Sequence, residues 1–133
     1  MTGPYKELRV WKQAMYLALE IYQHTQRFPK EELYGLTSQL RRAAVSVASN
    51  IAEGKGRSSD KELILFLHHA RGSLLEVETQ VLISRELGYL HDSAGAELLG
   101  QTEELAKSLN ALIKTLKNAS GVSREEERVE ASV

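Results

Sequence analysis

The chain has 133 residues, the length of one domain that can bury a core without disulfides or a structural metal. It has no cysteine, which excludes disulfides, thiolate catalysis and cysteine zinc sites, and its start, MTGPYKELRVWKQ, shows no export signal, so we expect a cytoplasmic protein. The net charge of −1 excludes binding of nucleic acid by the overall field alone, and the lack of a long apolar run excludes a membrane span.

The first two predicted elements are amphipathic helices. Apolar residues recur at steps of three and four over residues 7–28, and Pro29 ends this helix. After the connection PKEELYG we expect a second helix, with Thr37 as its N-cap and an apolar stripe that continues to Ile51. Each helix therefore has one face to bury against the others.

The stretch NIAEGKGRSSDKE, residues 50–62, could be a phosphate-binding loop or a tight corner between two helices. Gly54 and Gly56 lie where the second apolar stripe ends, and Ser59 with Glu62 has the spacing of a capping box. A phosphate-binding loop of the Walker type needs G-x-x-x-x-G-K-[ST] after a buried strand, which this stretch lacks. The pattern therefore predicts the end of one helix and the start of the next.

Two longer helices follow, over residues 60–88 and 93–118. Their apolar positions keep a seven-residue rhythm, which is typical of close packing between nearly antiparallel helices. Residues 121–133 are charged and have no apolar stripe, so we expect a disordered or frayed tail there. The fold predicted for residues 1–120 is all-α, an antiparallel up-down-up-down four-helix bundle.

Several further apolar residues lie beside the main stripes. One interpretation is that they widen the core-facing stripe, which is common in bundle helices. The other is an interface between copies of the chain, because monomers seldom leave so much contiguous apolar surface in water. The candidate interface residues are Tyr16, Leu19, Leu75, Leu82, Leu99, Ala106 and Ile113.

The predicted hairpin of the second and third helices also brings two charged residues together. It sets Arg42 near Glu76, which predicts a partly buried structural ion pair. The alternative is that both residues are solvated charges on helix surfaces, where ion pairs are weak.

No metal site or catalytic group is expected. A di-iron bundle needs paired Glu-x-x-His motifs, and the nearest pattern, Glu20 with His24, has another spacing and no counterpart. No nucleophile lies in an elbow or triad setting, so we expect a non-enzyme without cofactor, metal or small-molecule substrate.

One motif does carry chemistry. The stretch HHARGS, residues 68–73, resembles the phosphorylation site of histidine phosphotransfer domains, with His68 as the phosphate acceptor and Arg71 one turn away. The alternative is an ordinary face of an amphipathic helix that happens to carry this pattern.

Most of the chain resembles one known family. The resemblance rests on LRVWKQA (8–14), FPKEELYGLTSQLRRAAVSVASNIAEGKGR (28–57) and FLHHARGSLLEVETQVLISRELGYL (66–90). These stretches look like the four-helix bundle proteins encoded in intervening sequences of bacterial 23S ribosomal RNA genes. The resemblance implies a homopentamer, in which bundles assemble side by side as a ring. The accessory variability protein of diversity-generating retroelements is similar, which implies a nucleic-acid, ribonucleoprotein or reverse transcriptase partner.

Cations of the front half are the candidates for contact with phosphates. Residues 1–57 carry nine Lys/Arg against five Asp/Glu, whereas the rest of the chain carries eight against thirteen. The candidate nucleic-acid-binding residues are Arg9, Lys12, Arg41, Lys55 and Arg57. Their alternative role is solubility and pairing on helix surfaces. We therefore predict a non-enzymatic oligomeric adaptor, with a purely protein-binding scaffold or a phosphotransfer module as alternatives.

Overall fold

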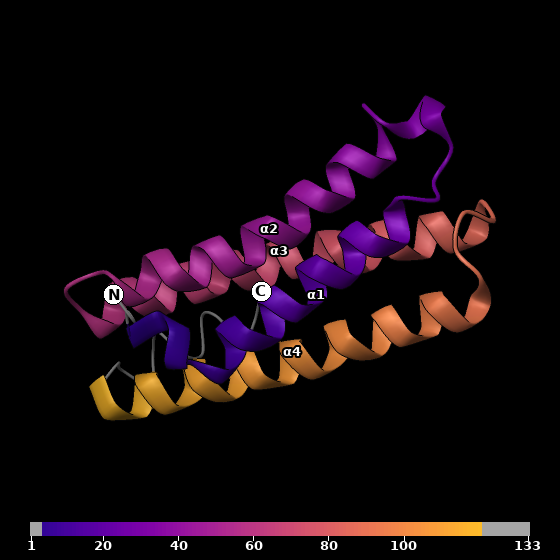
Figure 1. The fold of residues 1–133 in the computed structure, drawn as a ribbon. Helices are drawn as coiled ribbons and strands as arrows, with labels where there is room; N and C mark the ends of the chain where they lie inside the picture. Colours follow the sequence, from indigo (N-terminus) through magenta and orange to yellow (C-terminus); the bar gives the residue numbers. More distant parts are fainter. Residues whose placement is uncertain (1–3, 121–133) are drawn as a thin grey trace.

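The computed structural model describes residues 4–120, which form four α-helices and no strand (Figure 1). The helices are α1 (Arg9–Thr25), α2 (Leu36–Lys55), α3 (Asp60–Glu86) and α4 (Asp92–Ser120), with short 3-10 helices η1 (Pro4–Glu7) and η2 (Lys30–Glu32) before α1 and α2. Contacts join α1 to α2, α2 to α3, α3 to α4 and α4 to α1. The four-helix bundle is therefore confirmed, and the predicted tail, residues 121–133, lies outside the described residues.

The core lies along the axis of the bundle and takes one apolar face from each helix. Burying a leucine or isoleucine side chain stabilises the fold by about 1.5–3 kcal/mol. The largest aliphatic side chains with almost no solvent contact are Leu17, Ile21, Leu40, Ile51, Leu67, Leu98, Leu105 and Leu109. Within residues 4–120, none of the helices has an apolar stretch that could cross a bilayer.

The corner between α2 and α3 is the helix stop and helix start that the sequence predicts. Ser59 caps α3, because its Oγ accepts a hydrogen bond from the backbone N–H of Glu62 at 3.2 Å. The backbone N–H of Gly56 closes the last turn of α2 on the carbonyl oxygen of Ala52 at 3.2 Å. A helix rather than a strand precedes this corner, so it lacks the setting of a phosphate-binding loop.

Gly54 allows close helix packing and does not mark the end of α2, as its position in the sequence suggested. It lies inside the last turn of α2 and is buried. A Cβ atom at Gly54 would lie 2.6 Å from the Cβ of Phe66, which real Cβ atoms do not tolerate. The missing side chain therefore lets α2 and α3 approach each other closely at this end of the hairpin.

The start of α2 differs from the prediction. The helix begins at Leu36, with Gly35 at the N-cap position, and Thr37 is buried one residue inside the helix. Thr37 is therefore not the N-cap. The first turn is satisfied by Glu32, whose Oε1 accepts a hydrogen bond from the backbone N–H of Leu36 at 3.1 Å. A carboxylate from the preceding turn takes the capping role that we assigned to Thr37.

The end of α1 also differs from the prediction. The helix stops at Thr25, three residues before the expected end. Phe28 leaves the helix and packs into the core, with its ring centroid 5.5 Å from that of Tyr89. The hydroxyl of Tyr89 donates to Glu32 Oε2 at 3.0 Å. These contacts close the end of the bundle opposite the α2–α3 corner.

Candidate functional site

One end of the bundle carries an excess of positive charge. The antiparallel topology brings together residues 4–15, 49–66 and 113–120, at the left of Figure 1, and we call this part the cationic end. These residues include eight Lys/Arg and four Asp/Glu. The opposite end, residues 19–42 and 80–98, has five Lys/Arg and six Asp/Glu. The net charge near zero therefore hides an asymmetry between the two ends.

Four of the five candidate nucleic-acid-binding residues lie at the cationic end. Three of them are exposed on α1 and α2: Arg9, Lys12 and Lys55. The fourth, Arg57, follows α2, and its Nη2 lies 2.9 Å from Glu53 Oε1. Its guanidinium carbon also lies 4.8 Å from the centroid of the Phe66 ring. Arg57 is thus held in place by a carboxylate and an aromatic ring, while the other three cations face solvent.

Arg41 lies at the opposite end of the bundle and does not join this group. Its Nε donates to Thr25 Oγ1 at 2.8 Å, and its guanidinium carbon lies 4.7 Å from the centroid of the Tyr22 ring. These contacts tie α2 to α1. The geometry gives Arg41 the structural pairing that we considered as the alternative role of these cations.

The candidate interface residues divide between two surfaces. Tyr16 and Leu19 are 55% and 58% exposed on α1, and we call them the α1 patch. Leu75 and Leu82 are 60% and 36% exposed on α3. No contact joins α1 to α3 within residues 4–120, so the two sets lie on different sides of the bundle. Such exposed large side chains are what an interface would use.

Leu99 and Ala106 complete the second of these surfaces. Both lie on α4 and are partly buried against the core. Arg71 on α3 donates to Asn110 Oδ1 on α4 at 2.8 Å, which fixes the antiparallel register of the two helices. This register sets the two exposed α3 leucines opposite Leu99 and Ala106. We call these four residues the α3–α4 seam.

Ile113 does not belong to the seam, and its assignment to an interface is wrong. It is 4% exposed and is part of the hydrophobic core. Its number follows Leu99 and Ala106 at steps of seven, but a straight helix drifts by about 20° per heptad. Two heptads after Leu99, the line has therefore turned from the seam toward the core.

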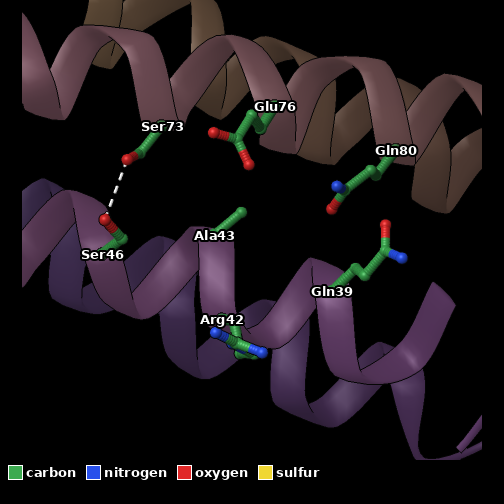
Figure 2. Close-up of a pocket in the computed structure, with 7 residues that line it drawn as sticks. All are labelled: Gln39, Arg42, Ala43, Ser46, Ser73, Glu76 and Gln80. Carbon is green, nitrogen blue, oxygen red and sulfur yellow. Dashed lines mark hydrogen bonds between the residues drawn. The ribbon is translucent and has the colours of Figure 1, made fainter. Parts of the chain in front are cut away.

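The predicted ion pair of Arg42 and Glu76 is not formed. None of the ion pairs within residues 4–120 joins them, and Figure 2 shows the guanidinium turned away from the carboxylate. The hydroxyls of Ser46 and Ser73 lie 2.8 Å apart, and this register sets Ala43 rather than Arg42 against Glu76. A difference of one residue in register moves Arg42 to the exposed face of α2.

Comparison with known proteins places this bundle in a family. A family model described as 23S rRNA-intervening sequence protein matches residues 6–111. The chain belongs to this family. The resemblance inferred from the sequence is therefore confirmed over most of the chain.

Solved structures share this fold, and one of them illustrates the likeness. It is the crystal structure of a protein of unknown function from the S23 ribosomal protein family of Bacteroides thetaiotaomicron VPI-5482. The two superpose with a TM-score of 0.71 at 20% identity, over 79% of this chain and 98% of the other. This likeness shows the fold alone. No curated protein matches the chain.

His68 is the candidate nucleophile of the chain, and its surroundings do not favour phosphotransfer. Its Nε2 has no contact with solvent, and its Nδ1 lies 2.9 Å from an Nη of Arg71. Burial, followed by the positive charges of Arg71, Lys117 and His69, lowers the pKa of His68 below its ordinary value. With Nε2 shielded from solvent and Nδ1 beside Arg71, neither ring nitrogen is open to a phosphoryl donor. Residues 4–120 also hold no cluster of His, Asp or Glu able to bind a metal ion.

Two exposed cations of the cationic end were missing from the candidates inferred from sequence. They are Lys61 on α3 and Lys114 on α4. Both lie in the acidic half of the chain, so a count of charge along the sequence passes over them. The signal that could have found them is topology: in an antiparallel bundle the first turns of α1 and α3 meet the last turns of α2 and α4.

Proposed function

We propose that this intervening-sequence protein is a cytoplasmic, non-enzymatic, oligomeric adaptor that binds RNA, DNA or a ribonucleoprotein through its cationic end. The observation that carries the proposal is the concentration of Lys/Arg in residues 4–15, 49–66 and 113–120, against a slight acidic excess at the other end. Phosphate binding depends on local cations that displace counterions, so a chain of net charge near zero can still bind a polyanion.

Two exposed apolar surfaces support the oligomeric part of this proposal. A closed ring needs two different faces on each copy, because one face of a subunit packs on another face of the next. The α1 patch and the α3–α4 seam supply two separate apolar surfaces of this kind. The number of five copies comes from the family resemblance. Cationic ends arranged round such a ring would multiply the phosphate contacts of one subunit.

Binding of a short single-stranded RNA at several KCl concentrations tests the role of the cationic end. We expect the affinity to fall steeply with salt, and the double variant Lys12→Gln/Lys55→Gln to bind about tenfold more weakly. The slope of log K against log salt should become shallower by about 1.4, since each lost phosphate contact removes about 0.7 for a single strand. Fluorescence anisotropy measures both quantities.

The matched control removes the same charge from the opposite end. Arg27→Gln/Lys30→Gln should leave the affinity and the salt slope unchanged, because these residues lie outside the cationic end. Equal losses in the two double variants would contradict the assignment of the site. RNA affinity that does not change with salt concentration would contradict binding through phosphates. A chain that binds no RNA but does bind a protein partner would favour the purely protein-binding scaffold.

The double variant Leu75→Lys/Leu82→Lys tests the α3–α4 seam. We expect it to keep its helical circular dichroism but to fall to the mass of one chain, 14.9 kDa, because charges at both positions would be buried without partners in an interface. The control Leu33→Lys/Leu87→Lys changes two exposed leucines outside the seam and should keep the native mass. Light scattering decides: an unchanged mass for the seam variant would reject this interface.

A further inference from the structure

A polar groove lies between α2 and α3, apart from the cationic end and the α3–α4 seam. Its volume is about 330 Å³. The α3 side is lined by Ser73, Glu76 and Gln80, and the α2 side by Gln39, Arg42, Ala43 and Ser46 (Figure 2). This size is sufficient for a small organic ligand.

The groove follows from the way α2 and α3 pack. Near the corner the helices are so close that Phe66 leaves no room for a side chain at Gly54. Farther along, the small side chains Ala43, Ser46 and Ser73 fill little of the interface. Figure 1 shows α2 diverging from α3 toward its first turn.

The groove offers hydrogen-bond acceptors and a negative charge. The Glu76 carboxylate points into the space between the helices, and the side chains of Gln39 and Gln80 extend toward each other across its wider part (Figure 2). Gln80 Oε1 has no contact with solvent and no hydrogen-bond partner. Buried acceptors in native proteins normally have a donor, so Gln80 Oε1 has the capacity to accept a hydrogen bond from a ligand in this groove.

Arg42 lines the groove but does not pair with its carboxylate. The Arg42 guanidinium is turned away from Glu76, and no ion pair joins the two residues within the described part of the chain. A ligand with N–H donors and a positive charge would therefore complement both Glu76 and Gln80.

We propose that the α2–α3 groove binds the guanidinium or primary ammonium head of a small organic cation. A guanidinium group pairs with a carboxylate through two parallel N–H···O bonds, which Glu76 can accept. A further N–H is then available for Gln80 Oε1, and the methyl group of Ala43 can pack against the alkyl stem of the ligand. This site is independent of the adaptor function, because the groove lies away from the cationic end and binds through the negative charge of Glu76.

Titration of the full chain with agmatine by isothermal calorimetry tests the proposal. We expect one site per chain, and binding about tenfold or more weaker in Glu76→Gln, which keeps the shape of the side chain and removes its charge. The control Glu78→Gln removes an exposed carboxylate of the same helix that does not line the groove, and should bind as the native chain does. Arg42→Gln should bind at least as tightly, because a neighbouring positive charge is lost.

A second set of ligands shows whether the bound head group belongs to an arginine side chain or to a free small molecule. The uncharged urea analogue of agmatine should not bind. A capped Gly-Arg-Gly peptide that binds more tightly than agmatine assigns the groove to an arginine side chain, whereas tighter binding of agmatine assigns it to a free small molecule. The proposal is overturned if agmatine fails to bind at millimolar concentration, or if Glu76→Gln binds it as well as Glu78→Gln does, with both variants folded by circular dichroism.

Discussion

Leu105→Ala is expected to lower the free energy of unfolding by about 2–5 kcal/mol, the range for truncation of a buried leucine. Leu105 is 1% exposed and lies on the inward face of α4 between Leu98 and Leu109. Removing its branched end leaves a cavity between helices that pack along their whole length and cannot fully collapse. Since small domains are stable by about 5–15 kcal/mol, such a loss is a large share of the total.

Urea denaturation followed by circular dichroism measures this change. Leu65→Ala is the matched control, because it is the same truncation at an exposed position of α3 outside the seam and the groove. We expect the control to change the free energy of unfolding by less than about 0.5 kcal/mol. If Leu105→Ala were as stable as Leu65→Ala, the inward face of α4 would be wrongly assigned.

Gly54→Ala is expected to destabilise the hairpin of α2 and α3 by about 1–3 kcal/mol, the usual cost of overpacking. The added Cβ would meet the Cβ of Phe66 at 2.6 Å and Leu63 Cδ1 at 3.1 Å. A Cβ atom is fixed to its backbone, so the clash with Phe66 can be relieved only if the two helices move apart. That movement would loosen the contacts on both sides of the corner.

Gly72→Ala makes the same change in α3 with the opposite expected sign. No atom lies within 4 Å of a Cβ built at Gly72, and alanine in a helix interior is favoured over glycine by about 0.5–1 kcal/mol. Thermal unfolding of the two variants should therefore give a lower midpoint for Gly54→Ala and a higher one for Gly72→Ala. A midpoint for Gly54→Ala as high as that for Gly72→Ala would mean that α2 and α3 are not in close contact at Gly54.

The fold could be predicted because its signals are local and periodic. The apolar steps of three and four set the helices, and Ser59 with Glu62 set the start of α3 through the spacing of one helical turn. The start of α2 was missed because Glu32, four residues before Leu36, supplies the hydrogen bond to the first turn. Nothing in the local pattern separates that carboxylate from an ordinary surface residue.

The candidate site was harder to predict because it depends on register and topology. The α2–α3 register sets Ala43 rather than Arg42 against Glu76, so the predicted ion pair does not form. The drift of a straight helix against a seven-residue repeat moved Ile113 into the core. The cationic end combines segments from all four helices, so only the antiparallel arrangement sets Lys61 and Lys114 at the same end of the bundle as Arg9 and Lys12.

The mass of the native chain at micromolar concentration tests most directly the central claim, that the α1 patch and the α3–α4 seam are covered by further copies of the chain. Sedimentation velocity measures this mass without a label or a surface. We expect a single species of about five times 14.9 kDa, with the helical content of the bundle. A well-folded species of 14.9 kDa would contradict the claim, because both apolar surfaces would then be stable in water without a partner.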